Sequence, residues 1–141
     1  MKVLVINGPN LNMLGLREPS IYGTQTYQDL ENYIKSSAEA LGIDVEVFQS
    51  NHEGVLVDKL QAARGNFDGI LINAAAYTHT SVALLDALLA AEIPAIEIHL
   101  SDITKREAFR QISYTAKACK EQIAGFGFEG YKKGLEALLA L

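Results

Sequence analysis

Short apolar runs alternate along the chain with longer segments that are suited to helices. Strands are predicted at 2–7, 43–49, 68–73, 94–99 and 122–126, and helices at 26–41, 53–64, 81–91, 105–119 and 129–140. Strands joined by helical crossovers are typical of a parallel sheet that helices cover on both faces. We therefore predict an α/β fold with residues 1–141 as a single domain. Its centre is a doubly wound, flavodoxin-like, five-stranded parallel sheet in three layers, α/β/α.

One long segment interrupts this alternation. Residues 7–24, NGPNLNMLGLREPSIYGT, follow the first predicted strand and show neither a helical nor a strand period. The segment holds three Asn, three Gly and two Pro, together with Arg17 and Tyr22. Structureless segments of this length inside a compact domain usually bind ligands or cover active sites. We therefore expect this loop to carry function.

The composition is that of a soluble globular protein, with 49% hydrophobic and 21% charged residues. The net charge is −5 and no basic stripe is present, which argues against nucleic acid and anionic membranes as partners. No apolar run approaches the roughly 20 residues that span a bilayer, and no signal peptide pattern precedes the first strand. The single Cys119 suits a reducing compartment, so we expect a cytoplasmic protein.

Polar side chains follow three of the predicted strands, at the point where each strand ends. They are Asn7, Asn10 and Asn12 after the first strand, Asn73 and the segment 77–81 after the third, and Glu97, His99 and Ser101 around the end of the fourth. In open parallel α/β sheets, ligands bind beyond the carboxyl ends of the strands, near the point where the strand order reverses. We therefore expect these clusters to converge on one pocket.

Glu97 and His99 are two residues apart on a predicted buried strand, so their side chains share one face of the sheet. Burying a carboxylate and an imidazole is costly unless the two are paired. A paired Glu97 would orient His99 and favour its protonated form, which is the environment of a general acid. The alternative is a satisfied polar pair without a catalytic role.

Further candidates for the pocket each have an ordinary structural alternative. His79 precedes a predicted helix, so its ring either enters the pocket or only lies beside the helix start. Arg106 and Arg110 are four residues apart on a predicted helix and share a face close to strand 94–99. They either supply hydrogen-bond donors to a carboxylate-bearing ligand or form a solvated helix surface.

The predicted helix at 82–91 is apolar on almost every side, with Asp86 as its lone charge. A sheet covers only one side of a helix, so we expect the other side to meet another subunit. Asp86 would then project into a subunit contact near a neighbour's pocket. The alternative is that Asp86 occupies a narrow exposed edge.

Sequence motifs for cofactors and metals are absent. No GxGxxG follows the first strand and no GxxxxGK[ST] is present, which argues against a dinucleotide and a P-loop. No spacing of His, Cys or carboxylates resembles a zinc or iron site, so we expect neither a metal nor a cofactor. Two non-enzymatic classes stay open: a flavodoxin-like module that binds a small ligand such as FMN, and an inactive assembly subunit.

Several long motifs resemble the type II 3-dehydroquinate dehydratases, the dehydroquinases of the shikimate and quinate pathways. They are NGPNLNMLGLREPSIYG at 7–23, SNHEG at 50–54, INAAAYTHTSVALLDAL at 72–88, IEIHLSDITKREAFRQIS at 96–113 and, more weakly, IAGFGFEGY at 123–131. The chain departs from the family pattern in two places. Asp102 stands where Asn is common, and Ala74-Ala75 stands where Pro-Gly or Ala-Gly is frequent, which affects loop shape.

The resemblance implies a cofactor-free anti elimination of water from 3-dehydroquinate, through an enolate, to 3-dehydroshikimate. It implies Tyr22 as the base, Arg17 as the group that activates Tyr22, and His99 as the proton donor. Asn10 would stabilise the enolate through a bound water, and Glu97 would hold His99. The implied substrate contacts are Asn73, His79, Asp86, Leu100, Ser101 and Arg110.

The resemblance also implies an assembly, a homododecamer of four trimers in which Asp86 reaches a neighbouring site. The choice of base likewise depends on the resemblance, because residue chemistry alone does not distinguish Tyr22 from Tyr27 or Tyr77.

Overall fold

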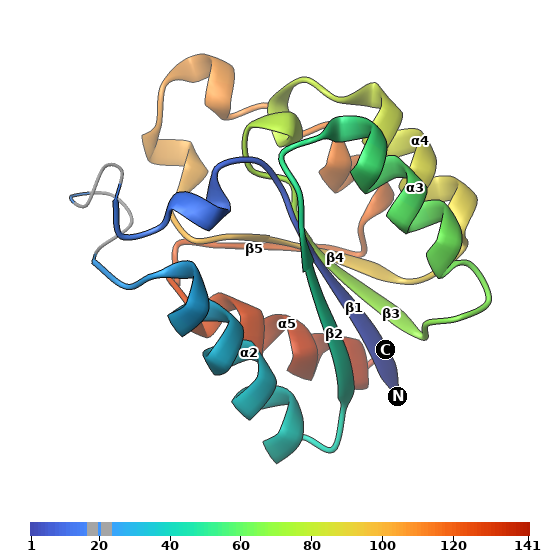
Figure 1. Cartoon of the computed structure of the whole chain (residues 1–141). Coiled ribbons are helices and arrows are strands. Elements are labelled where there is room, and N and C mark those ends of the chain that lie inside the picture. The colour runs from blue at the N-terminus through green and yellow to red at the C-terminus, as the bar shows by residue number, and fades with distance from the viewer. Residues whose placement is uncertain (17–19, 21–23) are drawn as a thin grey trace.

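The computed structural model of the protein describes residues 1–16, 20 and 24–141 (Figure 1). In this part of the chain a five-stranded parallel sheet forms, with the order β2-β1-β3-β4-β5. Its strands are β1 (Lys2–Asn7), β2 (Asp44–Gln49), β3 (Gly69–Asn73), β4 (Ala95–His99) and β5 (Glu121–Ala124). The flavodoxin-like order is confirmed, and the strand order reverses at β1 and β3, where such folds bind ligands.

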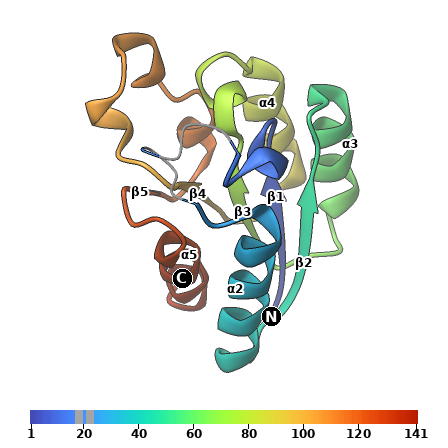
Figure 2. The same ribbon diagram turned by 60° about the vertical axis from the view of Figure 1, so that its left-hand side comes forward.

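Helices cover both faces of the sheet (Figures 1 and 2). One layer contains α2 (Tyr27–Ala40) and α5 (Glu129–Leu139), and the other contains α3 (Glu53–Ala63) and α4 (Val82–Ala91). Each of these boundaries lies within one residue of its prediction because capping signals and periodicity are local. Thr26 and Asp29, for example, form a reciprocal capping box at the start of α2.

Each face of the sheet has its own apolar cluster, since side chains alternate along a strand. Val3 and Val5 of β1 belong to the cluster under α2 and α5. Leu4 and Ile6 of the same strand belong to the cluster under α3 and α4. This continuous burial explains why β1 is a run of apolar residues rather than an alternating pattern.

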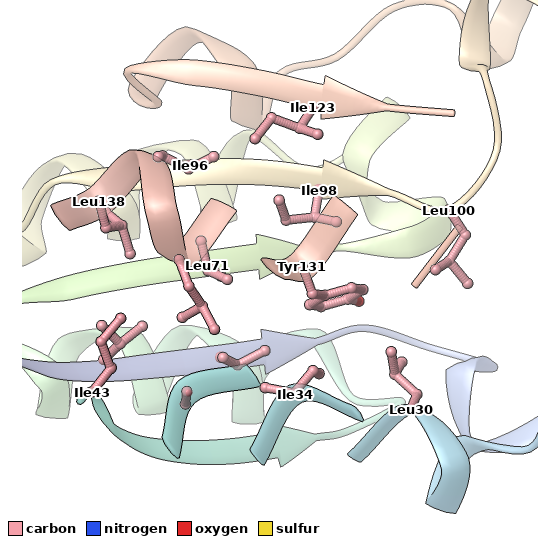
Figure 3. Close-up of a cluster of buried hydrophobic side chains, with 14 of the residues drawn as sticks. Leu30, Ile34, Ile43, Leu71, Ile96, Ile98, Leu100, Ile123, Tyr131 and Leu138 are labelled. Atoms are coloured by element: carbon pink, nitrogen blue, oxygen red, sulfur yellow. The ribbon is translucent and has the colours of Figure 1, made fainter. Parts of the chain in front are cut away.

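Helix α5 lies close against the sheet because Gly134 has no side chain. A Cβ atom at this position would come within 2.8 Å of Ile98 Cδ1 and 2.9 Å of Leu71 Cδ2. Tyr131, about one turn earlier in α5, is fully buried in the same cluster (Figure 3). The close approach of α5 therefore brings a tyrosine ring into the core, near the carboxyl ends of the strands.

The prediction of a helix at 105–119 is wrong. This fully described stretch forms short 3₁₀ turns, η3 (Ile103–Lys105), η4 (Ala108–Arg110) and η5 (Thr115–Ala118). The backbone N–H of Tyr114 donates to the carbonyl of Thr78 at 2.9 Å, whereas in a continuous helix it would donate within the segment. Local 3₁₀ bonds, such as the one from the N–H of Arg110 to the carbonyl of Glu107 at 2.8 Å, stand together with this long-range bond in place of a helical ladder. Strand β5 also ends earlier than predicted, before Gly125, whose φ of 90° turns the chain.

Candidate active site

A pocket lies beyond the carboxyl ends of β1, β3 and β4, where the sequence predicts it. It takes in about 680 Å³ of empty space, part of which is open to solvent. Seven of the predicted site residues line it: Asn10, Asn73, His79, His99, Leu100, Ser101 and Arg110. Arg106 lines it as well. The fold thus brings together residues that are up to 100 positions apart in the chain.

The loop after β1 is held in a fixed position against β3. A Cβ at Gly8 would lie 2.4 Å from the carbonyl oxygen of Ala74, so only glycine fits this contact. Asn10 adopts a left-handed conformation with φ of 69°, and its N–H donates to Asn51 Oδ1 at 3.0 Å. Positive φ at a non-glycine residue is uncommon, and asparagine tolerates it best. A short turn, η1 (Leu11–Met13), follows inside the loop that lacked any periodic pattern.

Glu97 and His99 form the pair that the sequence predicts. His99 Nε2 lies 2.7 Å from Glu97 Oε2, and both side chains are buried, Glu97 completely. A carboxylate accepts, so Nε2 of His99 donates, and the ring is held in one orientation. His99 lines the pocket and Glu97 lies behind it, which leaves Nδ1 as the ring nitrogen available to a ligand.

Glu97 is an ionised carboxylate despite its burial. Burial by itself raises its pKa, but hydrogen bonds from His99, Thr115 and Gln122, with the attraction of His99, bring the pKa below its usual value. Ser113 also donates to it, with Oγ 2.9 Å from Oε2. Local patterns gave no signal for these three further donors, because they reach Glu97 only through the tertiary fold.

His79 belongs to the pocket and not to a helix start. It ends the turn η2 (Ala75–His79), and Ser81 caps α4 instead by accepting from the N–H of Leu84 at 2.9 Å. His79 Nδ1 lies 2.7 Å from the carbonyl oxygen of Ile112. Because a carbonyl only accepts, Nδ1 carries the proton, and Nε2 is left for the pocket.

Asn73 is oriented by a buried network of neutral groups. Its amide nitrogen donates to the hydroxyl of Tyr131 at 3.0 Å, and its amide oxygen accepts from the N–H of Ala75 at 3.1 Å. The Tyr131 hydroxyl in turn donates to Asn7 Oδ1 at 2.7 Å, and Asn7 Nδ2 lies 3.3 Å from the Tyr27 hydroxyl. Burial raises the pKa of Tyr131 well above its usual value, so this hydroxyl stays a neutral donor. Sequence patterns predict no role for Tyr131, which lies in the weakest of the family motifs.

Arg106 and Arg110 both line the pocket, although the helix that was expected to align them does not form. Arg106 Nη1 lies 3.4 Å from Ser101 Oγ, and Arg110 Nε donates to Glu107 at 2.8 Å. Arg106 directly follows η3 and Arg110 ends η4, so both residues line the pocket without a continuous helix. The predicted helix is wrong, and of the two alternatives left open for these side chains, the pocket lining agrees with the first.

The remaining site candidates are Asp86, Arg17 and Tyr22, with Tyr27 and Tyr77 as the other tyrosines considered for the base. Asp86 is on the exposed side of α4 and does not line this chain's pocket. Arg17 and Tyr22 are outside the described residues. Of the other tyrosines considered as a base, Tyr77 donates to the carbonyl of Asn51 at 2.8 Å, and burial raises the pKa of Tyr27. Neither of these two tyrosines is part of the pocket lining.

Among the described residues, no three His, Cys, Asp or Glu side chains gather in a way that would hold a metal ion. No helix within 1–16, 20 and 24–141 is both long and apolar enough to cross a membrane.

The fold and pocket together define a flavodoxin-like α/β protein whose pocket, at the carboxyl ends of the strands, is lined by amide, imidazole and guanidinium side chains. The sequence model of the class II dehydroquinases matches residues 1–139, and the chain belongs to this family. It is 56% identical to the 3-dehydroquinate dehydratase of Geotalea daltonii over 138 residues, which is 98% of this chain and 96% of that protein.

Solved structures agree with this family. The chain superposes on the type II dehydroquinase of Butyrivibrio crossotus with a TM-score of 0.96 and 50% identity, covering 99% of this chain and 97% of the other. The type II dehydroquinase of Propionibacterium acnes matches over the same shares, with a TM-score of 0.95 and 40% identity. The chain therefore spans nearly the full length of its relatives.

Proposed function

We propose that this protein is a type II 3-dehydroquinate dehydratase, acting as a single catalytic domain over residues 1–141. It removes water from 3-dehydroquinate and yields 3-dehydroshikimate, in aromatic amino acid biosynthesis or in quinate breakdown. Family membership and relatives of this name support the proposal. The observation that carries it is the buried Glu97–His99 pair, whose imidazole faces a pocket lined by amides and guanidinium groups.

His99 serves as the general acid. Hydroxide is a poor leaving group, so a proton must reach the departing oxygen as the bond breaks. Nε2 is engaged with Glu97 and His99 lines the pocket, so we assign delivery of the proton to the other ring nitrogen, Nδ1. The ionised Glu97 offsets the positive charge that the ring carries before the transfer.

Tyr22 serves as the base that removes the proton beside the ketone, with Arg17 as its activator. These two roles rest on the family resemblance. A tyrosine with a pKa near 10 is only ~0.1% ionised at pH 7, and lowering the pKa by about 2 units raises this to ~10%. The shift corresponds to roughly 2.7 kcal/mol, which a single nearby guanidinium can supply.

The pocket lining suits the enolate and the polar groups of the substrate. Asn10 and a bound water would donate to the oxyanion as charge develops on it. The guanidinium of Arg110 and the hydroxyl of Ser101 suit the substrate carboxylate. Asn73, His79 and the Leu100 backbone would hold the hydroxyl groups. Every step is assigned to groups of the protein and a bound water, so we propose catalysis without a cofactor or a metal.

The enzyme is further proposed to assemble in the cytoplasm as a homododecamer of four trimers, with Asp86 reaching a neighbour's site. The exposed side of α4 supports a subunit contact, because Val82 and Leu89 leave 51% and 58% of their surfaces uncovered in the single chain. Asp86 lies on this same side, where it is free to approach a second copy.

A direct assay tests the function. Purified protein is mixed with 3-dehydroquinate in buffer with a chelator, and the ultraviolet absorbance of the conjugated enone product is followed. We expect absorbance to rise with the parent protein and to be nearly abolished in Tyr22→Phe and in His99→Ala. If folded and assembled parent protein gives no rise, the dehydratase is excluded and the binding-module alternative gains support.

A further inference from the structure

The carboxylate of Glu97 accepts more hydrogen bonds than the orientation of one imidazole requires. Within the described residues, its donors other than His99 are Ser113, Thr115 and Gln122, which we call the donor cluster. Gln122 Nε2 lies 2.6 Å from Oε2, and Ser113 Oγ lies 2.9 Å from Oε2 and 3.0 Å from Oε1. Thr115 Oγ1 donates to Oε1. Both carboxylate oxygens are therefore shared among several donors.

Such a donor set has a chemical consequence for the neighbouring ring. Where both groups are buried, as Glu97 and His99 are, an imidazolium beside a carboxylate can pass its shared proton across and leave a neutral imidazole beside a neutral acid. A neutral imidazole is a far weaker acid than an imidazolium and would not protonate a leaving hydroxide. Hydrogen bonds to the anionic form oppose this transfer, because they stabilise the carboxylate and not the carboxylic acid.

We propose that Ser113, Thr115 and Gln122 are positioning residues that hold Glu97 as an anion and so keep both protons on the His99 ring. The proposal rests on the proposed function, in which His99 is the proton donor. It deepens that function by assigning a task to three residues that lie behind the pocket and outside its lining.

The local structure holds each of the three donors next to Glu97. Ser113 Oγ also accepts the N–H of Ala116 at 3.0 Å, which fixes the hydroxyl while it donates to Glu97. Thr115 is fully buried at the start of η5. Gln122 sits directly beside Glu97 in the register of β5 and β4. The segment that departs from its predicted helix is thus the one that delivers two of the three donors.

Cys119, directly after η5, lies near enough to this carboxylate for the charge of Glu97 to act on its thiol. Burial, and then the negative charge of Glu97, raise the pKa of its thiol to about 12. The thiol is therefore neutral at physiological pH and neither adds nor removes charge around Glu97. Stabilisation of the anion thus comes from the three donors and from His99.

Matched substitutions at one position test the proposal. Thr115→Val keeps the volume and β-branching but removes the donor, whereas Thr115→Ser keeps the donor. We expect Thr115→Val to lower kcat about 10- to 100-fold, the effect of losing one charge-assisted hydrogen bond, with KM changed less than about threefold. Thr115→Ser should restore most of the loss. Gln122→Met should behave like Thr115→Val, and Gln28→Met, on the exposed side of α2, should leave kcat unchanged.

A second measurement does not depend on turnover. In ¹⁵N-histidine spectra of sedimented protein, the His99 Nε2 signal reports whether that nitrogen carries its proton. We expect the ¹⁵N chemical shift of a protonated Nε2 in the parent and in Thr115→Ser. In Thr115→Val and Gln122→Met this chemical shift should move toward that of an unprotonated nitrogen.

The two measurements separate the possible failures. Unchanged kcat and unchanged nitrogen signals in folded Thr115→Val and Gln122→Met would overturn the role of the donor cluster. A parent protein without dehydratase activity would instead overturn the proposed function, while the nitrogen signals would still decide whether the donor cluster controls the proton on His99.

Discussion

Two polar clusters adjoin the pocket, each centred on a fully buried side chain, Glu97 or Tyr131, and they differ in charge. The charged cluster consists of Glu97 with His99, Ser113, Thr115 and Gln122. The neutral cluster consists of Tyr131 with Asn7, Asn73 and Tyr27. Each lends one side chain to the pocket lining, His99 from the first and Asn73 from the second.

The two clusters suit different tasks, one in proton transfer and the other in positioning the substrate. A buried charge needs several donors, and it can exchange a proton with the imidazole beside it. A neutral network needs only one partner for each donor and acceptor, and it fixes geometry without responding to protons near pH 7. We therefore expect the charged cluster to govern proton transfer and the neutral cluster to govern substrate position and stability.

The largest effect is expected from removing the charge at Glu97. Glu97→Gln keeps the size of the side chain but no longer stabilises an imidazolium, so kcat should fall about 100- to 1000-fold, within the range of general acid catalysis. Steady-state kinetics with the enone absorbance measure this loss. Glu46→Gln on β2, where the carboxylate is partly exposed and pairs with Lys59, should change kcat little. A similar kcat for both variants would contradict the role of Glu97.

The next largest effect is expected at Tyr131, whose hydroxyl hydrogen bonds to both asparagines of the neutral cluster. Tyr131→Phe removes a hydroxyl that connects Asn7 and Asn73, and the unpaired amide groups should cost about 1–3 kcal/mol of unfolding free energy. Because Asn73 loses its orientation, KM should rise several-fold while kcat changes less. Denaturant unfolding and kinetics measure the two changes. Tyr33→Phe, whose ring contact with Phe128 is kept, should preserve both quantities, so equal losses in the two variants would contradict this role.

A moderate effect is expected in the pH dependence of stability, with opposite signs for the two clusters. The pKa of Glu97 is lowered in the folded state, so its contribution is present above the unfolded carboxyl pKa and is lost as pH falls through the folded pKa. The pKa of Tyr131 is raised, so its contribution is present below about pH 10 and is lost as pH rises further.

Denaturant unfolding across a pH series checks both signs. Glu97→Gln should reduce the acid-side slope of the unfolding free energy, and Tyr131→Phe should reduce the alkaline-side slope. If the unfolding free energy of both variants changes with pH as steeply as that of the parent, other groups control the pH dependence.

The smallest effect is expected at Cys119, the thiol beside the charged cluster. Burial is the main cause of its pKa of about 12, and the charge of Glu97 is the lesser one. Glu97→Gln should therefore speed its reaction with a disulfide reagent at pH 8 by less than about tenfold, well short of the rate in unfolded protein. A rate that reaches the unfolded value would mean that charge, and not burial, protects the thiol.

The sequence by itself determined the framework of this protein. Apolar runs and caps placed the strands and the helices α2, α3, α4 and α5 because these signals are local. The rule that ligands bind at strand ends located the pocket, and the two-residue spacing of Glu97 and His99 identified a buried pair. Each of these inferences needed only neighbouring residues and a general property of parallel sheets.

The tertiary structure decided what surrounds that pair. Residues 105–119 include Lys, Arg, Ala and Gln, which favour helices, yet helix propensity amounts to less than about 1 kcal/mol for each such residue. Satisfying a buried carboxylate is worth more than this preference, so Ser113 and Thr115 turn toward Glu97 and the segment breaks into 3₁₀ turns. Tyr131 likewise meets Asn7 across 124 positions of the chain, a separation at which no local pattern signals a partner.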